Sequence, residues 1–327
     1  MGDPSGIGPE VICKALAALP AAERGDMIVI GDPAILERAN GLTNAGLAVT
    51  TDDAPEGAVR VIAVACPEAD TIRDGTISPG GGHAAYGCVS QAVAMAEAGE
   101  IGVIVTAPLN KTALHLAGHE YDGHTGLIQH LTGAPSSYML LASERLSTIH
   151  VSTHVSLMDA IGRCRTARIL DTIRIGHAHF RRLGTPRPRI AVAGLNPHCG
   201  EAGIFGHEDA EQIEPAVEAA RAEGIAASGP ISADTVFHRA VGGEFDLVVA
   251  QYHDQGHIPT KLIAFDTTVN VSLGLPVLRT SVDHGTAFDI AWTGKADHTN
   301  MLAAIAYARR ILAAPAIEAE DRLRSAV

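Results

Sequence analysis

The sequence is poor in aromatic side chains, in positive charge and in long apolar runs. Of 327 residues, 4% are aromatic and 46% are hydrophobic, so the core must consist mainly of Ala, Val, Ile and Leu. A chain of this length can form two domains or one large α/β unit. The formal net charge of −13 argues against nucleic acid or an anionic membrane as a partner, because both are bound by an excess of Lys and Arg. A small anionic substrate is still possible, since a few local cations can bind it.

Cysteine is sparse and shows no metal-binding or redox spacing. The number is odd, the spacing is wide and no CxxC motif occurs, which favours reduced thiols; the residues are Cys13, Cys66, Cys88, Cys164 and Cys199. No apolar run approaches the ~20 residues of a membrane helix, and no signal peptide opens the chain. We therefore expect a cytoplasmic protein without a membrane partner.

Short apolar runs alternate with longer helical patterns along the chain. This alternation predicts an α/β fold with a largely parallel sheet covered by helices, and the 34 glycines suit its tight turns. The expected strands are residues 27–31, 61–65, 101–108, 137–142, 189–197 and 245–252. The expected helices include residues 9–19, 86–100 and 207–224.

The first residues form a loop pattern that lacks its strand. The sequence GDPSGIGPE leads into a helix whose first turn holds Pro9 and Glu10. A loop of this kind normally follows a strand, and none precedes it in the sequence. We expect either that this strand is absent or that the numbered chain begins inside a longer natural sequence.

Histidines lie at the ends of three segments that resemble strands. They are His154 in STIHVSTH, His198 in RIAVAGLNPHCG, and His253, with His257, in FDLVVAQYHDQGH. Ligands gather at the carboxyl ends of strands in α/β sheets, and three neutral imidazoles with open positions suit a divalent metal. The alternative is that each histidine is hydrogen-bonded locally. We favour a shared metal, because three histidines occupy equivalent strand ends.

Two aspartates are candidates for partners of this metal site or for a general base. Asp254 follows His253 directly, and a carboxylate beside a metal-ligating His fixes its tautomer. Asp234 lies in GPISADTVF, and its alternative is an ordinary helix N-cap. For His257 a structural role is the better interpretation.

A second group of polar residues suits an anion. Lys261, Asn270 and Arg279 follow one another at a spacing of nine, and Lys and Arg can bind a phosphate or a carboxylate. The sequence GHTG predicts a glycine-bounded turn whose His124 and Thr125 suit a phosphate. The alternative for the cations is an ordinary exposed surface, but a chain this acidic has few of them.

Two glycine-containing segments are candidates for a nucleotide site. Residues 281–297, SVDHGTAFDIAWTGKAD, form a polar loop before a helix and could hold a nucleotide. Residues 80–85, GGGHAA, resemble a dinucleotide fingerprint, but only TISP precedes them, where a fingerprint needs a strand. We therefore favour the later segment.

Taken together, the motifs resemble the 4-hydroxythreonine-4-phosphate dehydrogenases, a family of pyridoxal phosphate biosynthesis. The resemblance covers nearly the whole chain and rests on GDPSGIGPE, TAPLNK, GHTG, STH, GLNPHCGEAGIFGHED, GPISADT, YHDQGHIPTK and HGTAFDIAWTGKAD. It implies a three-layer α/β fold similar to isocitrate and isopropylmalate dehydrogenases, with the active site in the cleft between two subdomains. These subdomains would be residues 1–122 plus 291–327 and residues 123–290.

The resemblance also implies which residues act. Metal ligands fall on His154, His198 and His253, substrate contacts on His124, Thr125, Lys261, Asn270 and Arg279, catalytic positions on Lys261, Asp254 and Asp234, and cofactor contacts on His284, Gly285, Asp289 and Asn300. It implies NAD, one divalent metal per site (Zn, Mg, Mn or Co) and a homodimer whose active sites are built by both subunits.

The implied reaction is oxidation of a hydroxyl with hydride transfer to NAD, followed by loss of CO2 with a divalent metal as Lewis acid. The implied substrate is 4-hydroxythreonine 4-phosphate. Gly126 stands where the family often has an acidic residue, and HIPTKL and TSVDHGTAFDIAWTGKA are closer to a branch that acts on 4-phospho-threonate or 4-phospho-erythronate. A cis-dihydrodiol carboxylate dehydrogenase and a non-catalytic metal- or phosphate-binding protein are further alternatives.

Overall fold

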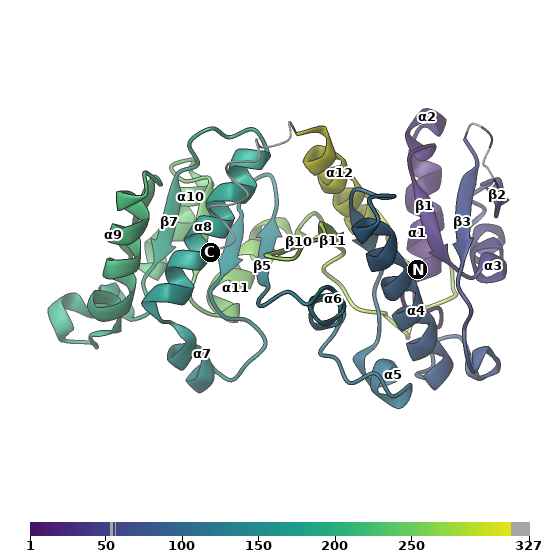
Figure 1. Cartoon of the computed structure of the whole chain (residues 1–327), viewed down its shortest axis with the longest axis horizontal. Coiled ribbons are helices and arrows are strands. Elements are labelled where there is room, and N and C mark those ends of the chain that lie inside the picture. The colour runs from purple at the N-terminus through teal and green to yellow at the C-terminus, as the bar shows by residue number, and fades with distance from the viewer. Residues whose placement is uncertain (53–54, 56, 315–327) are drawn as a thin grey trace. The chain divides into compact units, whose positions relative to one another are not determined.

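The computed structural model describes residues 1–52, 55 and 57–314, and the chain forms two compact units. Unit 1 consists of Met1–Ser137 and Leu275–Ala308, and unit 2 of Tyr138–Gly274 with the described residues from Arg309 onward. In Figure 1 most of unit 1 is purple and blue, and most of unit 2 is teal and green.

The boundaries between the units lie elsewhere than at the expected positions, after residues 122 and 290. Helix α6 (His124–Thr132) belongs to unit 1 because it packs against α4 (Pro79–Glu97). Strand β11 (Arg279–Ser281) also belongs there, because it pairs in parallel with β4 (Ile104–Thr106). Two of the expected substrate-binding segments therefore fold together in unit 1.

Unit 1 has helices on both faces of its parallel strands. Strand β3 pairs in parallel with β1 and β2. Along β1, Val29 packs with α1 and α3, whereas its neighbour Ile30 packs with α4 on the opposite face. The elements of unit 1, besides those given above, are α1 (Gly8–Ala18), α2 (Ala21–Arg24), β1 (Ile28–Gly31), α3 (Pro33–Thr43), β2 (Val49–Thr50), β3 (Val59–Ala63), η1 (Ala69–Thr71), α5 (Lys111–Leu116) and, as far as Ala308, α12 (Thr299–Ala313).

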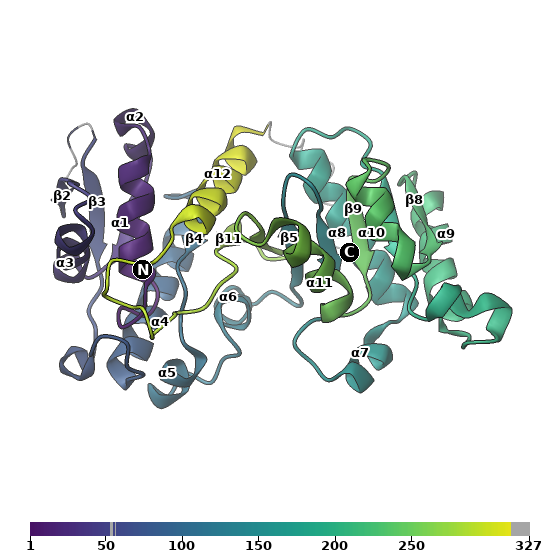
Figure 2. The same cartoon turned by 180° about the vertical axis from the view of Figure 1, so that it is seen from behind.

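Unit 2 contains six strands in the order β10-β5-β6-β9-β7-β8. Its elements are β5 (Tyr138–Ala142), β6 (Thr148–His150), α7 (Leu157–Arg163), α8 (Thr166–Arg182), β7 (Ile190–Ala193), η2 (Pro197–Gly203), η3 (Asp209–Ile213), α9 (Glu214–Ala222), β8 (Ala227–Ile231), α10 (Ala233–Val241), β9 (Leu247–Ala250), α11 (His253–Ala264) and β10 (Val269–Leu273). Figures 1 and 2 show α8 on one face of this sheet and α10 and α11 on the other. Every residue of β7 and β9 is buried, as expected for parallel strands covered on both faces.

The α/β prediction is confirmed, and each of the six expected strands is present. Strand β5 departs from the parallel arrangement, since it pairs antiparallel with both β6 and β10. The connection from β5 to β6 is too short for the crossover that a parallel pair requires. The expected cleft of the isocitrate dehydrogenase type stays a prediction.

The glycine pattern of residues 80–85 lies within the first turns of α4, and not in a loop between a strand and a helix. The decision against a dinucleotide fingerprint there is therefore confirmed.

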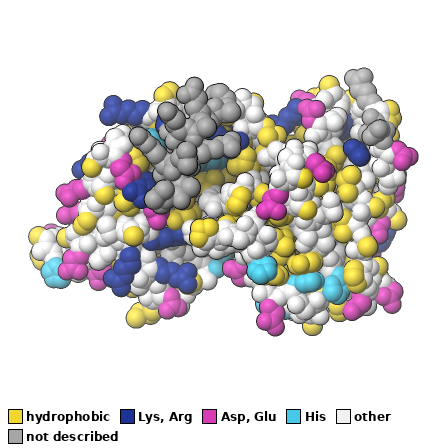
Figure 3. Space-filling view, in the orientation of Figure 1, with side chains coloured by type: hydrophobic (Ala, Val, Ile, Leu, Met, Phe, Trp, Pro, Cys, Tyr) yellow, Lys and Arg dark blue, Asp and Glu magenta, His cyan; other side chains and the backbone are white. Residues whose placement is uncertain are grey.

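All five cysteines are free thiols. Within the described part of the chain, no helix is both long and apolar enough to cross a membrane. On the face shown in Figure 3, Asp and Glu side chains are spread over both units.

Candidate functional site

A buried arginine is the main feature of the candidate substrate site in unit 1. Arg279 lies on β11 with 3% of its surface exposed. Its guanidinium donates to the Thr106 hydroxyl from Nη2 at 2.8 Å and from Nε at 3.1 Å, and to the Thr125 hydroxyl from Nη1 at 3.3 Å. Burial lowers the pKa of this guanidinium to about 9. A guanidinium presents a planar set of N–H donors that can bind a phosphate or a carboxylate in a bidentate way, so the position is suited to an anionic ligand.

The start of helix α6 lies beside Arg279. Gly123 precedes the helix with φ 132°, and no side chain caps the helix N-terminus. The expected glycine-bounded turn is therefore a helix start, where free backbone N–H groups and the helix dipole favour an anion. His124 occupies the first helical position, and its buried Nε2 has no hydrogen-bond partner among the described residues. Burial, and next the charge of Arg279, keep the pKa of His124 well below its ordinary value, so the ring is neutral.

Glycine at position 126 has a steric reason. A Cβ at Gly126 would lie 2.0 Å from Oδ1 of Asp122. The carboxylate of Asp122 thus lies over the first turn of α6, in the space that a larger residue 126 would need.

The expected cofactor segment is a long loop before α12, as predicted. The Asn300 side chain accepts the backbone N–H of Asp283 at 2.7 Å, so it holds the start of the loop. His284 pairs through Nδ1 with the Gly285 carbonyl at 3.0 Å, and its buried Nε2 has no partner within the part of the chain that the structure describes. Gly285 and Asp289 are exposed. The loop therefore offers one ordered imidazole and an exposed carboxylate for contacts with a ligand.

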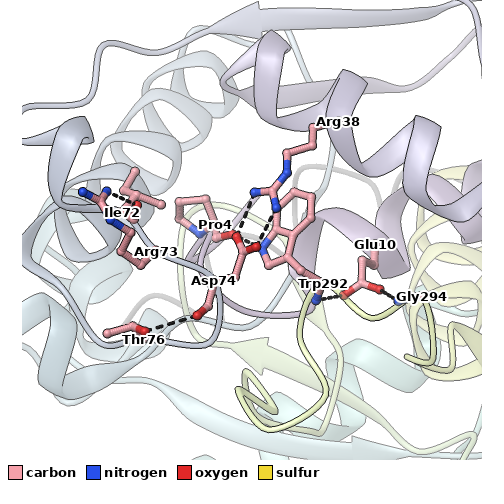
Figure 4. A network of polar contacts seen from close by, with 9 residues as sticks. All are labelled: Pro4, Glu10, Arg38, Ile72, Arg73, Asp74, Thr76, Trp292 and Gly294. Carbon is pink, nitrogen blue, oxygen red and sulfur yellow. Dashed lines mark hydrogen bonds and ion pairs between the residues drawn. The ribbon is translucent and has the colours of Figure 1, made fainter.

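Helix α1 holds the end of the same loop through two charged side chains. The buried Glu10 carboxylate accepts the backbone N–H groups of Trp292 at 2.6 Å and Gly294 at 2.7 Å (Figure 4). Lys14 donates to the carbonyls of Gly294 and Ala296. On the outer side, the Arg38 guanidinium lies 4.0 Å from the centre of the Trp292 ring. The loop is thus fixed at both ends by unit 1.

The three predicted metal ligands all lie in unit 2, after adjacent strands. Strand β9 pairs in parallel with β6 on one side and β7 on the other. His154 follows β6, His253 follows β9 and His198 follows β7, each within a few residues of the strand end. The prediction that the histidines occupy equivalent strand ends is therefore confirmed, although their metal binding is not thereby tested.

Two of the three rings lie close together. The ring centroids of His154 and His253 are 5.6 Å apart. Nδ1 of His253 pairs with Oδ1 of Asp254 at 2.6 Å, which leaves Nε2 available as a ligand. Neutral imidazoles oriented by a carboxylate fit a divalent ion chemically. In the described ranges, however, no group of three or more His, Cys, Asp or Glu residues is close enough to hold a metal ion.

A buried histidine pair lies next to this group. His150 Nδ1 faces the Met139 carbonyl at 3.2 Å, and His257 Nδ1 faces both His150 Nε2 at 3.1 Å and the His253 carbonyl at 3.0 Å. Because carbonyls only accept, Nδ1 carries the hydrogen in both neutral rings. The His257 ring stacks on that of His253 at 3.6 Å between centroids. His257 therefore supports His253, and His150 is a participant that the sequence did not indicate.

His198 lies on an unusual loop. Five consecutive residues, 198–202, have positive φ between 41° and 81°, and four of them are not glycine. The loop is anchored by Asp209, a buried aspartate that the sequence analysis missed. Its signal was present, since Asp209 shares the apolar face of the expected helix with Ile213 and Val217.

The remaining candidate residues lie on separate elements of unit 2. Asp234 is exposed in the first turn of α10 and accepts the Ser232 hydroxyl at 2.6 Å. Its interpretation as an N-cap is wrong, because the N-cap position is Ser232. Lys261 lies on α11, with Nζ 5.9 Å from the centre of the Phe265 ring. Asn270 lies on β10, and its buried Oδ1 has no hydrogen-bond partner in the described residues.

Polar side chains gathered at the ends of parallel strands are the arrangement of many α/β enzymes. Comparison with known proteins defines the family. The chain belongs to the family described as pyridoxal phosphate biosynthetic protein PdxA, which matches residues 23–308.

Among its relatives, the D-threonate 4-phosphate dehydrogenase of Cupriavidus necator is 47% identical over 311 residues, which are 93% of each chain. The 4-hydroxythreonine-4-phosphate dehydrogenase of Beijerinckia indica is 46% identical, over 95% of this chain and 93% of the relative. The crystal structure of the Klebsiella pneumoniae 4-hydroxythreonine-4-phosphate dehydrogenase superposes with a TM-score of 0.85 at 45% identity, covering 95% of this chain and 97% of that one.

These relatives are named dehydrogenases. The chain is accordingly an oxidoreductase, and its class implies a cofactor of the nicotinamide type. The family expected from the sequence motifs is confirmed.

Proposed function

We propose that the protein catalyses NAD- and divalent-metal-dependent oxidation, followed by β-decarboxylation, of 4-hydroxythreonine 4-phosphate. The observation that carries this proposal is the buried guanidinium of Arg279 beside the uncapped start of α6. A buried cation and a helix N-terminus at one point suit a doubly charged group such as a phosphate. A relative named for this substrate is 46% identical to the chain.

The substrate's anionic end is bound by Arg279, Thr125 and His124. Thr125 keeps the guanidinium in place through its hydroxyl, at 3.3 Å. His124 is neutral, so it contacts the substrate without adding charge. Lys261 and Asn270 contribute further contacts, and the buried Oδ1 of Asn270 is available to a donor on the substrate.

The divalent ion, which can be Zn, Mg, Mn or Co, is held by His154, His198 and His253. When bound, this ion would polarise the oxygen of the reacting carbon, and NAD would supply the hydride acceptor. Asp254 accepts the Nδ1 hydrogen of His253 and so keeps Nε2 directed for binding.

The chain's own acids and bases move two protons. One leaves the substrate hydroxyl as the hydride is lost, and Asp254 or Asp234 accepts it as general base. The other is delivered to carbon after CO2 has departed, and Lys261 supplies it. The loop before α12 would hold the nicotinamide cofactor, through His284, Gly285, Asp289 and Asn300.

The protein acts as a homodimer with active sites shared between subunits. Helix α11 carries His253 and also exposes a row of apolar residues, with Ile258, Leu262 and Phe265 exposed by 63%, 85% and 69%. Such a row on one helix face suits an interface. Sharing of the site would also explain why residues 1–52, 55 and 57–314 of one chain do not gather three metal ligands.

D-Threonate 4-phosphate is a second candidate substrate, because a relative named for it is 47% identical. Both substrates carry the same phosphate and differ at C2, which bears an amine in one and a hydroxyl in the other. The test is NADH formation with Mg²⁺, Mn²⁺, Co²⁺ or Zn²⁺ on both compounds, on D-erythronate 4-phosphate and on a cis-dihydrodiol carboxylate. Turnover of the amino acid phosphate supports the proposal, turnover of D-threonate 4-phosphate alone supports the second candidate, and inactivity on every phosphorylated compound contradicts both.

A further inference from the structure

The loop that carries His198 has an energetically costly backbone. His198, Cys199, Glu201 and Ala202 have φ of 51°, 55°, 41° and 55°. Left-handed backbone costs an L-residue other than glycine about 1–2 kcal/mol, and here four such residues are close together. A conformation of this kind persists only where its surroundings determine it.

One buried carboxylate ties the residues just before this left-handed turn. Asp209, at the start of η3, is 1% exposed. Its Oδ1 accepts the backbone N–H of Leu195 at 2.8 Å, and its Oδ2 accepts both the backbone N–H and the side-chain Nδ2 of Asn196 at 3.0 Å. Three donors therefore converge on one carboxylate, immediately after strand β7 ends.

The packing around Asp209 leaves little room for another arrangement. A Cβ at Gly194 would lie 2.7 Å from Sγ of Cys199 and 2.9 Å from Oδ1 of Asp209. Glycine at position 194 thus allows the carboxylate and the left-handed turn to approach the strand end together. The Cys199 backbone N–H, in turn, donates to the Asn196 carbonyl at 3.1 Å, so the tied residues connect directly to the turn.

We propose that Asp209 is a positioning residue for His198: it fixes the end of β7 and the left-handed turn, and thereby the imidazole. The inference rests on the proposed role of His198 as a metal ligand. Asp209 is buried and acts on His198 through its hydrogen bonds to Leu195 and Asn196. An ionised carboxylate is required because it only accepts hydrogen bonds, whereas an amide would direct an NH2 group at existing donors.

The test compares Asp209→Asn with Glu208→Gln. Glu208 is the neighbouring carboxylate, partly exposed, and accepts one bond from Asn196 Nδ2 at 2.8 Å. We expect Asp209→Asn to weaken Mn²⁺ or Zn²⁺ affinity, measured by competition with a chelator, about 10- to 100-fold. Hydrogen exchange at Leu195 and Asn196 in the metal-free protein should accelerate. Glu208→Gln should change neither quantity.

A double-mutant cycle with His198→Ala distinguishes an effect of Asp209 on the position of His198 from an effect of Asp209 on the stability of the whole fold. If Asp209 acts through His198, Asp209→Asn should have no further effect on metal affinity in the His198→Ala background. Equal losses in both backgrounds would mean that Asp209 supports the fold as a whole, and would overturn the inference. An unchanged metal affinity in Asp209→Asn alone would also overturn it.

Two further results distinguish this inference from the proposed function. If His198→Ala itself leaves metal affinity unchanged, the assignment of His198 as a ligand fails, and the inference fails with it. If His198→Ala weakens binding but Asp209→Asn does not, only the inference fails. Should Asp209→Asn not fold, Asn196→Ala removes one of the three donors and should give a smaller loss in the same direction; no loss would again overturn the inference.

Discussion

The region around Arg279 in unit 1 and the histidine region in unit 2 differ in how far one chain assembles them. Arg279, Thr106 and Thr125 are joined by hydrogen bonds of 2.8 to 3.3 Å. Of the three histidines, by contrast, two rings are 5.6 Å apart and the third lies on a left-handed loop, and the described residues do not form a complete metal site.

This difference indicates which of the two regions is already organised in the folded single chain. The anion region already holds its buried guanidinium by hydrogen bonds in the folded chain, so its geometry is set before any ligand binds. The histidine region places its three histidines after adjacent strands, and under the proposed function the ion or a second subunit would complete it. Anion binding should therefore depend on residues within one chain, and metal binding on assembly.

The largest expected effect is that of removing a ligand from the histidine region. Loss of a residue that only orients a ligand costs about 10- to 100-fold in affinity, so His253→Ala should weaken metal binding by about 10³-fold. The measurement is metal affinity by competition with a chelator. His130→Ala, an exposed histidine of α6, is the control. Equal metal affinity in the two variants would contradict the assignment.

The next largest effect is expected in the anion region. Arg279→Met keeps the length of the side chain but removes its charge. Because loss of one partner of a buried charge pair costs about 2–5 kcal/mol, kcat/KM for the phosphorylated substrate should fall about 10²-fold. Metal affinity should stay as in the wild type. The exposed Arg187→Met is the control, and a fall in metal affinity with Arg279→Met would break the separation of the two regions.

Acid should destabilise the histidine region. Burial lowers the pKa of His150 to about 4, against 6.5 for an exposed histidine. The unfolded chain therefore binds more protons below pH 6.5, and stability falls as pH decreases from there towards 4. For His150 the loss between pH 7 and pH 5 is roughly 2 kcal/mol. Urea unfolding at both pH values should show a smaller difference in His150→Leu than in the wild type or the exposed His130→Gln; an equal difference would contradict this account.

The smallest effect is expected at the surface of unit 1. Arg38 pairs with Asp74 at 2.8 Å and stacks on Trp292, but both charged side chains are about half exposed, at 56% and 45%. Arg38→Gln should change the free energy of unfolding by less than about 1 kcal/mol. Glu10→Gln alters the buried carboxylate that holds the loop in Figure 4 and should cost more, about 1–3 kcal/mol. Equal values from urea unfolding would contradict this ranking.

Much of the candidate site could be predicted from the sequence, because the residues that follow an apolar run mark the end of a strand. Apolar runs located β7 and β9, and the segment STIHVSTH indicated the strand end before His154; parallel pairing then brings His154, His198 and His253 to one edge of the sheet. The spacing of Lys261, Asn270 and Arg279 could not reveal that Arg279 pairs with β4 in unit 1, whereas the other two lie in unit 2. Assignment to a unit depends on long-range pairing, which local patterns do not encode.

Other features were missed because they depend on contacts between distant residues. The position of Asp209 on the apolar helix face predicts its burial, but its role becomes visible only when its carboxylate accepts hydrogen bonds from Leu195 and Asn196. The N-cap of α10 is Ser232, two residues before the expected Asp234, and Ser and Asp are comparable caps by sequence alone. The antiparallel pairing of β5 depends on the length of a short connection.

The most direct test of the account measures NADH formation in a two-by-two design. The enzyme, stripped by a chelator or resupplied with Mn²⁺, is given 4-hydroxythreonine either with or without its 4-phosphate. The account predicts rapid NADH formation only when both the phosphate and the metal are present, because Arg279 binds the phosphate and the three histidines bind the metal. Undiminished rates without metal, or on the unphosphorylated compound, would contradict it.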